Sequence, residues 1–321
     1  MLMIQWLFFW SLFISTFIAL SASIPLYTWA ALEVNTIAFI PMMLDPSKPE
    51  SMRGAMKYFF IQAYASLIFL MGPLTNYLPE MTIFVAMMMK LGMSPFHNWY
   101  PSVMASLNWF SALFISTWQK IAPLWILSEN INYINLIAPI AALNAIVGGL
   151  GGLMQTEIRP LLAFSSIGHM GWLLFSIPLS NLIMYFYFIS YSIHLVVLMY
   201  LFYNTKINTP KDLSSSNSLS TQKKMMLALT LLSLGGLPPL LGFIPKFLVL
   251  LISTPLFIPP LMLMLGSYIN IYYYMSIMWL SFMTNPQPLV SMNMHKNLIK
   301  ITLMIILIML MMLICGLNMH L

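Results

Sequence analysis

Four ionisable side chains lie inside stretches of the sequence that are otherwise apolar: Glu33, Lys90, Lys120 and Lys246. A charge at the middle of a lipid bilayer costs at least about 2.5 to 3.5 kcal/mol on insertion scales, so such residues mark a functional site by default. Burial disfavours a charged lysine and a nearby carboxylate favours it, so small changes around the lysine can move its proton. The pattern indicates a path for ions, with Glu33 as the candidate neighbour of Lys90. The alternative is that each lysine reaches the membrane surface along its flexible stem.

Two histidines are candidates for the same path because imidazole gains and loses protons near neutral pH. His169 stands mid-segment among small polar residues, which favours a role in proton transfer or in organising water over a purely structural one. His97 is a weaker candidate, since Trp99 and Tyr100 beside it would equally suit an anchor at the membrane interface. His194 has few polar neighbours and ranks lower still. Histidines and carboxylates do not recur at the spacing of metal ligands, so we expect no metal site.

The composition excludes an ordinary soluble protein. Hydrophobic residues make up 60% of the 321 residues and charged residues only 6%, which indicates an integral membrane chain with a single transmembrane domain. The formal charge of +6 is not gathered in a basic helix, so we expect no nucleic-acid partner. Cys315 is the only cysteine, which excludes a disulfide or iron–sulfur site built from this chain. The first segment lacks a basic leading region, so we expect a retained helix rather than a signal peptide.

Apolar segments of the length that spans a bilayer, roughly 20 residues each, recur along the whole chain. The sequence therefore predicts an all-α polytopic membrane protein with about eleven transmembrane helices. Their approximate ranges are 1–22, 24–44, 54–73, 81–104, 109–127, 133–154, 160–177, 182–203, 225–252, 256–283 and 298–317.

Basic residues test this helix count, because short loops with Lys and Arg collect on one side of a membrane. With alternating sides, the loops after the second, sixth, eighth and tenth segments fall on one face. These loops and their flanks hold ten basic residues, and the opposite face has none. The ten are Lys48, Arg53, Lys57, Arg159, Lys206, Lys211, Lys223, Lys224, Lys296 and Lys300.

Two of the predicted helices contain residues that break a helix. One holds Gly235, Gly236 and three prolines before Lys246, and the other holds Gly92 and Pro95 just after Lys90. Proline lacks the N–H that closes a helical turn, so free carbonyls must find protein or water. Paired interruptions in matching halves are typical of inverted-repeat transporters. We expect a first repeat at about 1–127, a second at about 133–283 and a C-terminal helix at about 298–317.

Four motifs in order along the chain carry a family resemblance: Lys90 to His97, Thr117 to Pro123, Leu161 to Trp172, and Leu232 to Lys246. Through them the chain resembles the antiporter-like subunits of respiratory complex I, the NADH:ubiquinone oxidoreductase. The resemblance covers nearly the whole chain. It also implies the shortened animal mitochondrial form, which lacks the first helices of full-length members.

The resemblance assigns roles to the buried residues. It implies that Glu33 and Lys90 form an intramembrane pair, that Lys120 is the central relay lysine, and that Lys246 belongs to the second broken helix, with His169 between them. The implied activity is proton translocation, as a translocase subunit, coupled to NADH oxidation and ubiquinone reduction elsewhere in the complex.

The resemblance also implies a location and partners. The chain would lie in the mitochondrial inner membrane, with its basic loops and N-terminus on the matrix side. Its partners would be other membrane-arm subunits, including neighbouring antiporter-like subunits, and phospholipids. No cofactor is expected in this chain, because FMN, iron–sulfur clusters and ubiquinone would belong to partner subunits. Two alternatives stay open, a free-standing cation/proton antiporter and a purely structural membrane subunit.

Overall fold

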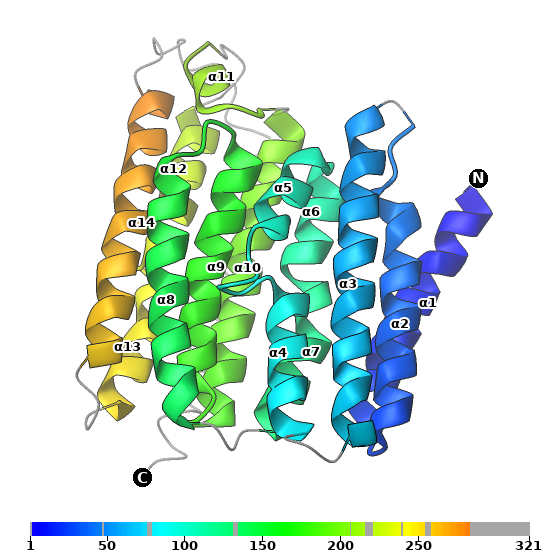
Figure 1. Cartoon of the computed structure of the whole chain (residues 1–321). Coiled ribbons are helices and arrows are strands. Elements are labelled where there is room, and N and C mark those ends of the chain that lie inside the picture. The colour runs from blue at the N-terminus through cyan, green and yellow to red at the C-terminus, as the bar shows by residue number, and fades with distance from the viewer. Residues whose placement is uncertain are drawn as a thin grey trace.

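The computed structural model describes residues 2–46, 48–75, 79–130, 134–205, 207–215, 221–238, 240–253 and 258–282. Every regular element in these ranges is an α-helix, and the helices stand side by side in one bundle (Figure 1). The predicted all-α architecture is therefore confirmed. In chain order the helices are α1 (Leu2–Ser21), α2 (Pro25–Met43), α3 (Pro49–Thr75), α4 (Pro79–Leu91), α5 (Trp99–Ser106), α6 (Trp109–Ser116), α7 (Trp118–Glu129), α8 (Ile134–Leu153), α9 (Ile158–Ser176), α10 (Asn181–Thr205), α11 (Pro210–Ser215), α12 (Thr221–Gly235), α13 (Phe243–Ile252) and α14 (Ile258–Phe282).

Ten of the predicted segments correspond to helices or pairs of helices, and the segment at 298–317 lies outside the described residues. Three predicted segments are each divided in two: 81–104 into α4 and α5, 109–127 into α6 and α7, and 225–252 into α12 and α13. The first and third divisions fall where the sequence predicts a break. The division at Thr117 was not predicted, and the angles of this residue, φ −119° and ψ −73°, depart from those of a regular helix.

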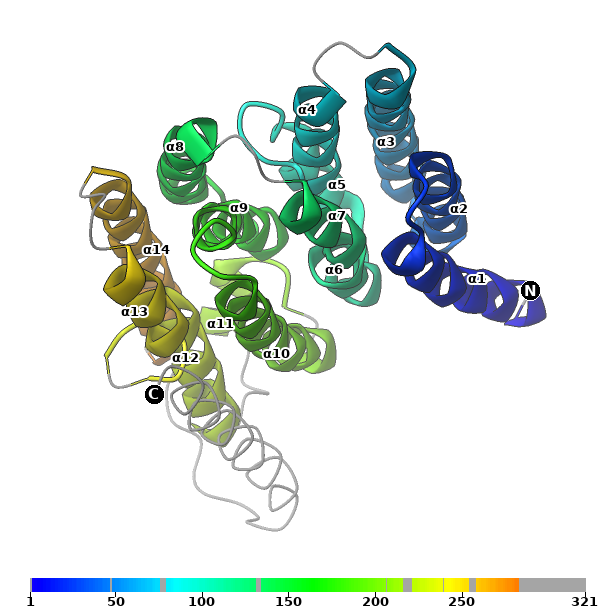
Figure 2. The ribbon, with the colours of Figure 1, turned by 90° about the horizontal axis from the view of Figure 1, so that it is seen from below.

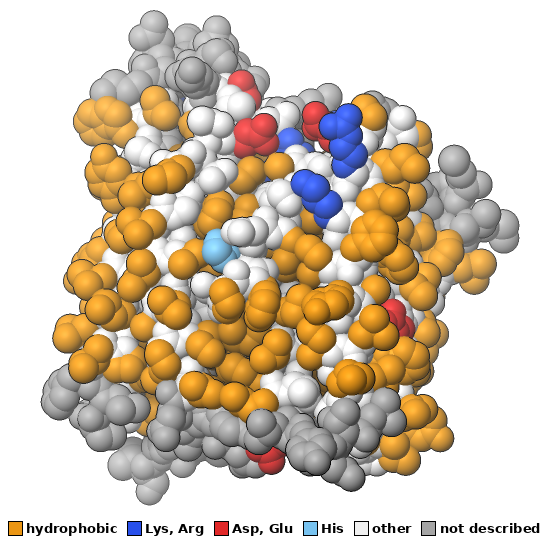
Figure 3. Space-filling view, in the orientation of Figure 1, with side chains coloured by type: hydrophobic (Ala, Val, Ile, Leu, Met, Phe, Trp, Pro, Cys, Tyr) orange, Lys and Arg blue, Asp and Glu red, His pale blue; other side chains and the backbone are white. Residues whose placement is uncertain are grey.

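Length and composition alone identify four helices that could cross a membrane, in the segments Pro49–Pro73, Leu136–Leu153, Asn181–Thr205 and Ile258–Phe282. The divided helices are individually too short for this, since a span needs roughly 20 residues. Large apolar side chains cover the middle of the face shown in Figure 3, and charged side chains gather mainly towards its upper end. This distribution suits a surface surrounded by lipid.

The bundle is centred on α9, which lies between α8 and α10 when viewed from below (Figure 2). Every residue of α9 is buried except Arg159 and Phe164. The close approach of α8 depends on glycine, because a Cβ added at Gly148 would lie 2.5 Å from the backbone N of Gly168. A helix buried on all sides can hold polar side chains away from lipid, and α9 carries Ser165, Ser166 and His169 at such positions.

The connections from α2 to α3, from α8 to α9 and from α10 to α12 all lie at the upper end of the bundle in Figure 1. These are three of the four loops that the charge pattern assigns to one face, and the fourth lies outside the described ranges. The last of the three includes α11, where Asp212 accepts hydrogen bonds from the backbone N–H groups of Asn208 and Thr209. These bonds stabilise the carboxylate and lower the pKa of Asp212 below its usual value.

Candidate functional site

The first broken helix ends at Gly92, which adopts the left-handed conformation with φ +67°. Its N–H donates to the Met89 carbonyl, and the N–H of Met93 donates to the Met88 carbonyl. These two bonds form a Schellman cap, which requires a residue that tolerates positive φ. The cap ends α4 inside the bundle, two residues after Lys90. Side chains also pair backbone groups that the break leaves without helical partners. Gln62 donates a hydrogen bond to the Lys90 carbonyl over 3.2 Å, and Asn144 accepts one from the backbone N–H of Ser94.

The second broken helix ends in the same way at Gly236, with φ +86°. The N–H of Gly236 donates to the Ser233 carbonyl and the N–H of Leu237 to the Leu232 carbonyl, so α12 has a Schellman cap as well. The returning chain passes so close that a Cβ at Gly242 would lie 1.7 Å from the Ser233 oxygen. Glycine is therefore required at both Gly236 and Gly242, for conformation at the first and for space at the second.

Lys246, near the start of α13, reaches back across this second break. Its ammonium donates hydrogen bonds to the carbonyls of Gly235, at 2.6 Å, and Leu234, at 3.4 Å. It also lies 5.9 Å from the centre of the Trp172 ring. These carbonyls carry the negative end of the α12 dipole, which favours a cation at this position. The side chain is 4% exposed, so Lys246 is buried rather than extended to the membrane surface.

Lys90 is buried too, at 6% exposure, but its ammonium has no hydrogen-bond partner among the described residues. It interacts electrostatically with Glu33 on α2, without a salt bridge. Glu33 is half-buried and accepts hydrogen bonds from Ser66 and from Thr36, the latter over 3.4 Å. Glu33 on α2 therefore influences Lys90 on α4 electrostatically without forming a salt bridge, and the pairing of the two residues stays a prediction.

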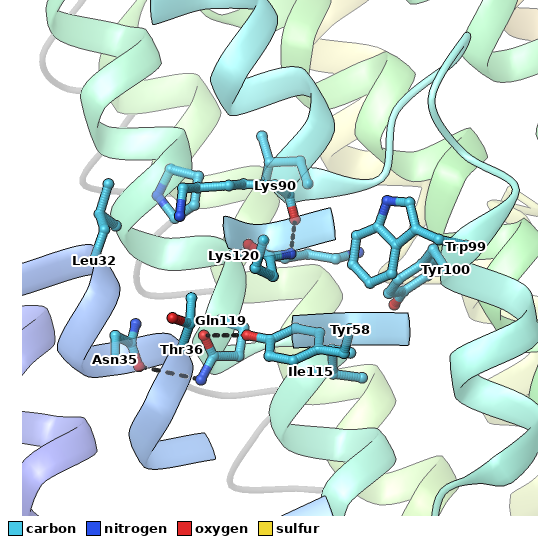
Figure 4. A pocket seen from close by; sticks show the side chains of 13 residues that line it. Leu32, Asn35, Thr36, Tyr58, Lys90, Trp99, Tyr100, Ile115, Gln119 and Lys120 are labelled. Carbon is cyan, nitrogen blue, oxygen red and sulfur yellow. Dashed lines mark hydrogen bonds between the residues drawn. The ribbon is translucent and has the colours of Figure 1, made fainter. Parts of the chain in front are cut away.

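A cavity joins Lys90 to Lys120 (Figure 4). Its volume is about 20 Å³, measured as the space open to the centre of a water molecule, and this is enough for at least one water. Polar side chains from three helices form part of its wall. Tyr58 on α3 donates to Gln119 over 3.4 Å, and Gln119 donates to Asn35 on α2 over 3.2 Å. Water in this cavity would have several polar partners.

Lys120 is only 2% exposed, and its ammonium also lacks a hydrogen-bond partner within the described ranges. It lies in α7 just after the division from α6. Pro123 in the same helix cannot donate a hydrogen bond to the Gln119 carbonyl one turn earlier. The ammonium lies 5.1 Å from the centre of the Tyr100 ring and 5.4 Å from that of Tyr191. Such cation–π contacts stabilise a buried cation by about 2 kcal/mol or more when it is desolvated.

His169 on α9 is buried, at 4% exposure, and its ring packs against that of Tyr191. Its Nδ1 is 3.0 Å from the Tyr187 hydroxyl. Its Nε2 makes no hydrogen bond of normal geometry to a described residue, but the ring interacts with the backbone of Leu234. A second, smaller cavity of about 10 Å³ is lined by His169, His194 and residues of the α12 break, including Ser233 and Leu234. His194 donates through Nδ1 to the Ser190 carbonyl over 2.6 Å. His194 is thus closer to the candidate path than its sequence surroundings indicate.

His97 lies apart from these groups. It is half-buried in the segment between α4 and α5, with its ring 6.3 Å from that of Phe164, and it lines neither cavity. Of the residues predicted from sequence, the structure therefore brings Lys90 and Lys120 to one cavity, and His169 and Lys246 to the second break. Glu33 lines neither cavity and interacts with Lys90 electrostatically, without a salt bridge.

Sequence reasoning missed several polar side chains that contact this group. Tyr100 and Tyr191 hold Lys120 between their rings, and Gln62 and Gln119 line the first cavity. The only available signal was proximity in the chain, since Gln119 precedes Lys120 and Tyr100 follows the Gly92 break. Tyrosine is too common in this sequence, with 15 residues, for any one of them to be singled out.

Comparison with known proteins identifies the family. The family model described as NADH:quinone oxidoreductase/Mrp antiporter, TM, matches residues 73–270. The chain is 38% identical over 284 residues to NADH-ubiquinone oxidoreductase chain 2 of Locusta migratoria, covering 84% of this chain and 83% of that protein. It is 38% identical over 285 residues to the chain of the same name from Lumbricus terrestris, covering 83% of each.

A solved structure agrees on the fold. A chain of respiratory complex I from Thermus thermophilus matches with a TM-score of 0.81 at 23% identity, covering 88% of this chain and 71% of that one. The family resemblance carried by the four sequence motifs is therefore confirmed. The chain belongs to the NADH:quinone oxidoreductase and Mrp antiporter family of membrane proteins, together with the NADH-ubiquinone oxidoreductase chain 2 proteins.

Proposed function

We propose that this chain is a core membrane-arm subunit of respiratory complex I that translocates protons across the mitochondrial inner membrane. The names of its relatives at 38% identity support the assignment to complex I. The lysines buried inside the bundle support the movement of protons, because unpaired charges at this depth are costly without a functional role. NADH oxidation and ubiquinone reduction in partner subunits would drive the movement, so this chain would act as part of a translocase.

The proposed relay runs from Glu33 and Lys90 through the water-sized cavity to Lys120, and then by His169 to Lys246. The observation that carries it is the cavity shared by Lys90 and Lys120, because both line its wall and neither buried ammonium has a hydrogen-bond partner among the described residues. Water there would connect them and let protons move between them. His97, beside the first break, would be a side contributor at most.

The proposed topology has eleven spanning helices in two inverted repeats, at about 1–127 and 133–283, followed by a helix at about 298–317. The two Schellman-capped breaks support this division, because one falls in each half. The basic loops and the N-terminus would face the matrix, as the positive-inside pattern favours.

The partners that we propose are other membrane-arm subunits, including neighbouring antiporter-like subunits, together with phospholipids. FMN, the iron–sulfur clusters and ubiquinone would be held by partner subunits, and redox chemistry would take place there. Exposed apolar side chains on α1, such as Trp6, Trp10 and Phe17, support contact with lipid or with apolar helices of another subunit.

The test is Lys120→Met in the assembled complex, with the exposed residue Lys57 changed to Met as the matched control. We expect Lys120→Met to lower proton pumping and coupled NADH oxidation together, by at least about tenfold, and Lys57→Met to leave both unchanged. Normal pumping by an assembled Lys120→Met enzyme would overturn the relay.

The same experiment separates the two alternatives. Failure of the Lys120→Met complex to assemble, while the Lys57→Met complex assembles, would favour a purely structural subunit. Cation/proton exchange by this chain alone in lipid vesicles would favour a free-standing antiporter.

A further inference from the structure

The carbonyl of Leu234, at the end of α12, is within reach of polar side chains from two other helices. The Lys246 ammonium on α13 donates a hydrogen bond to it over 3.4 Å. The ring of His169 on α9 interacts with the Leu234 backbone as well. Leu234 and His169 also line the second cavity together, so the two residues border the same space. One backbone acceptor therefore has two candidate donors.

Tyr187 on α10 determines which nitrogen of His169 is available to this carbonyl. The Tyr187 hydroxyl lies 3.0 Å from Nδ1 of His169, so Nε2 is the nitrogen left for Leu234. A carbonyl oxygen only accepts hydrogen bonds, so Nε2 must carry a proton to bond it. In the neutral ring Nδ1 then accepts from the Tyr187 hydroxyl. Both ring nitrogens are thus matched to the groups that they face.

The bond from His169 to Leu234 does not have normal geometry while Lys246 is in place. Nε2 of His169 makes no such bond to a described residue, and the side chain is only 4% exposed. The Lys246 ammonium meanwhile donates to the carbonyls of Gly235 and Leu234. Hydrogen bonds from a charged donor are stronger than those from a neutral one. Lys246 therefore holds the end of α12 as long as it keeps its charge.

We propose that His169 is a second donor to the end of α12, which bonds the Leu234 carbonyl through Nε2 when Lys246 loses its charge. This inference rests on the proposed function, in which Lys246 gains and loses a proton. The neutral amine of Lys246 is a weaker donor than the ammonium, and carbonyls at a buried helix end need partners. The exchange of donors transfers no proton, because Nε2 already carries the one that it donates.

The experiment is a double-mutant cycle of Lys246→Met and His169→Leu, read as the denaturation temperature of the purified complex. With Lys246 present, we expect His169→Leu to lower this temperature only slightly, because the ammonium holds the carbonyls. In the Lys246→Met background the same change should lower it by at least about twice as much, since both donors are then lost. Equal decreases in the two backgrounds would overturn the second donor.

His169→Gln tests whether the hydrogen bond, and not the shape of the ring, is responsible. The amide nitrogen of glutamine can take the place of Nε2 and donate to the Leu234 carbonyl. In the Lys246→Met background we expect glutamine to keep most of the stability that leucine loses.

The matched control is His194→Leu. His194 lines the same cavity, but its Nδ1 donates to the Ser190 carbonyl within its own helix. We expect this change to lower the denaturation temperature equally with and without Lys246. A dependence on Lys246 as large as that of His169→Leu would overturn the inference, because any loosening of the cavity would then have the same effect.

Pumping by Lys120→Met distinguishes failure of this inference from failure of the proposed function. Loss of pumping in Lys120→Met, together with equal decreases for His169→Leu in both backgrounds, would overturn the second donor and leave the relay standing. Normal pumping with unequal decreases would overturn the relay and support the second donor. If the complex with both Lys246→Met and His169→Leu does not assemble, the glutamine variant decides. Assembly with the stability of Lys246→Met alone supports the inference, and equal failure overturns it.

Discussion

The two broken helices end in the same cap but place their lysines differently. Gly92 and Gly236 have the same left-handed conformation and the same pair of capping hydrogen bonds. Lys90 precedes its glycine on the helix that ends, whereas Lys246 comes from the helix that follows and returns to the break. The Lys246 ammonium bonds the α12 carbonyls, while the neutral side chains of Gln62 and Trp99 donate to the carbonyls of Lys90 and Met89 at the end of α4.

The sequence pattern suggests one role for both lysines, but the structure indicates a different role for each. At the second break the buried charge stabilises the interrupted backbone, so its proton and the local structure are linked. At the first break neutral donors satisfy the backbone, so the Lys90 ammonium remains available to the cavity and to Glu33. Proton loss at Lys246 should therefore loosen the end of α12, whereas proton loss at Lys90 should leave α4 in place.

The largest effect is expected from Gly236→Ala. A non-glycine residue in the left-handed conformation costs about 1 to 2 kcal/mol, and the new Cβ would lie 2.8 Å from Nζ of Lys246. The lysine must move away from the carbonyls, so strain and loss of its hydrogen bonds coincide. We expect an assembled complex that has lost pumping and denatures at a lower temperature.

Gly235→Ala is the matched control for that change. Gly235 ends α12 in a helical conformation, and a Cβ there would meet the side chain of Ile271, which can shift. We expect a clearly smaller loss of pumping and stability. Equal damage from the two substitutions would show that crowding, and not the left-handed cap with its lysine, determines the sensitivity of this break.

The next largest effect distinguishes the lysines directly. Lys246→Met removes a charged donor from two carbonyls, and hydrogen bonds to charged groups contribute about 1.5 to 3 kcal/mol. Lys90→Met removes an ammonium without a hydrogen-bond partner among the described residues. We expect both variants to lose pumping, but only Lys246→Met to lower the denaturation temperature of the purified complex. A comparable loss of stability in Lys90→Met would contradict the proposed difference between the breaks.

The sequence was enough to predict the breaks at Gly92 and Gly236, because glycine and proline act locally on the backbone. It was not enough for the division at Thr117. Pro41, Pro73 and Pro139 lie inside α2, α3 and α8 without dividing them, so proline alone does not mark a break. Whether a helix divides depends on the donors and acceptors that neighbouring helices supply, and a single sequence does not give these.

The buried lysines could be found from sequence because charge is rare in this chain, at 6% of residues. Their aromatic neighbours could not, since aromatic residues make up 14% and serve mainly in packing. The positions of Tyr191 and His194 beside His169 follow from the packing of α10 against α9, which brings together residues that are far apart in the sequence. The rare charged residues were therefore enough to propose the relay from sequence, whereas the side chains between them could be identified only from the tertiary structure.

The smallest expected effect concerns the neutral donor at the first break. Gln62→Leu keeps the size of the side chain but removes the hydrogen bond to the Lys90 carbonyl, and a neutral bond of this kind contributes about 1 kcal/mol. We expect a small decrease in the denaturation temperature, less than for Lys246→Met, and pumping well above that of Lys90→Met. If Gln62→Leu abolishes pumping in a stable complex, the main role of Gln62 is in proton transfer through the cavity and not in its hydrogen bond to the end of α4.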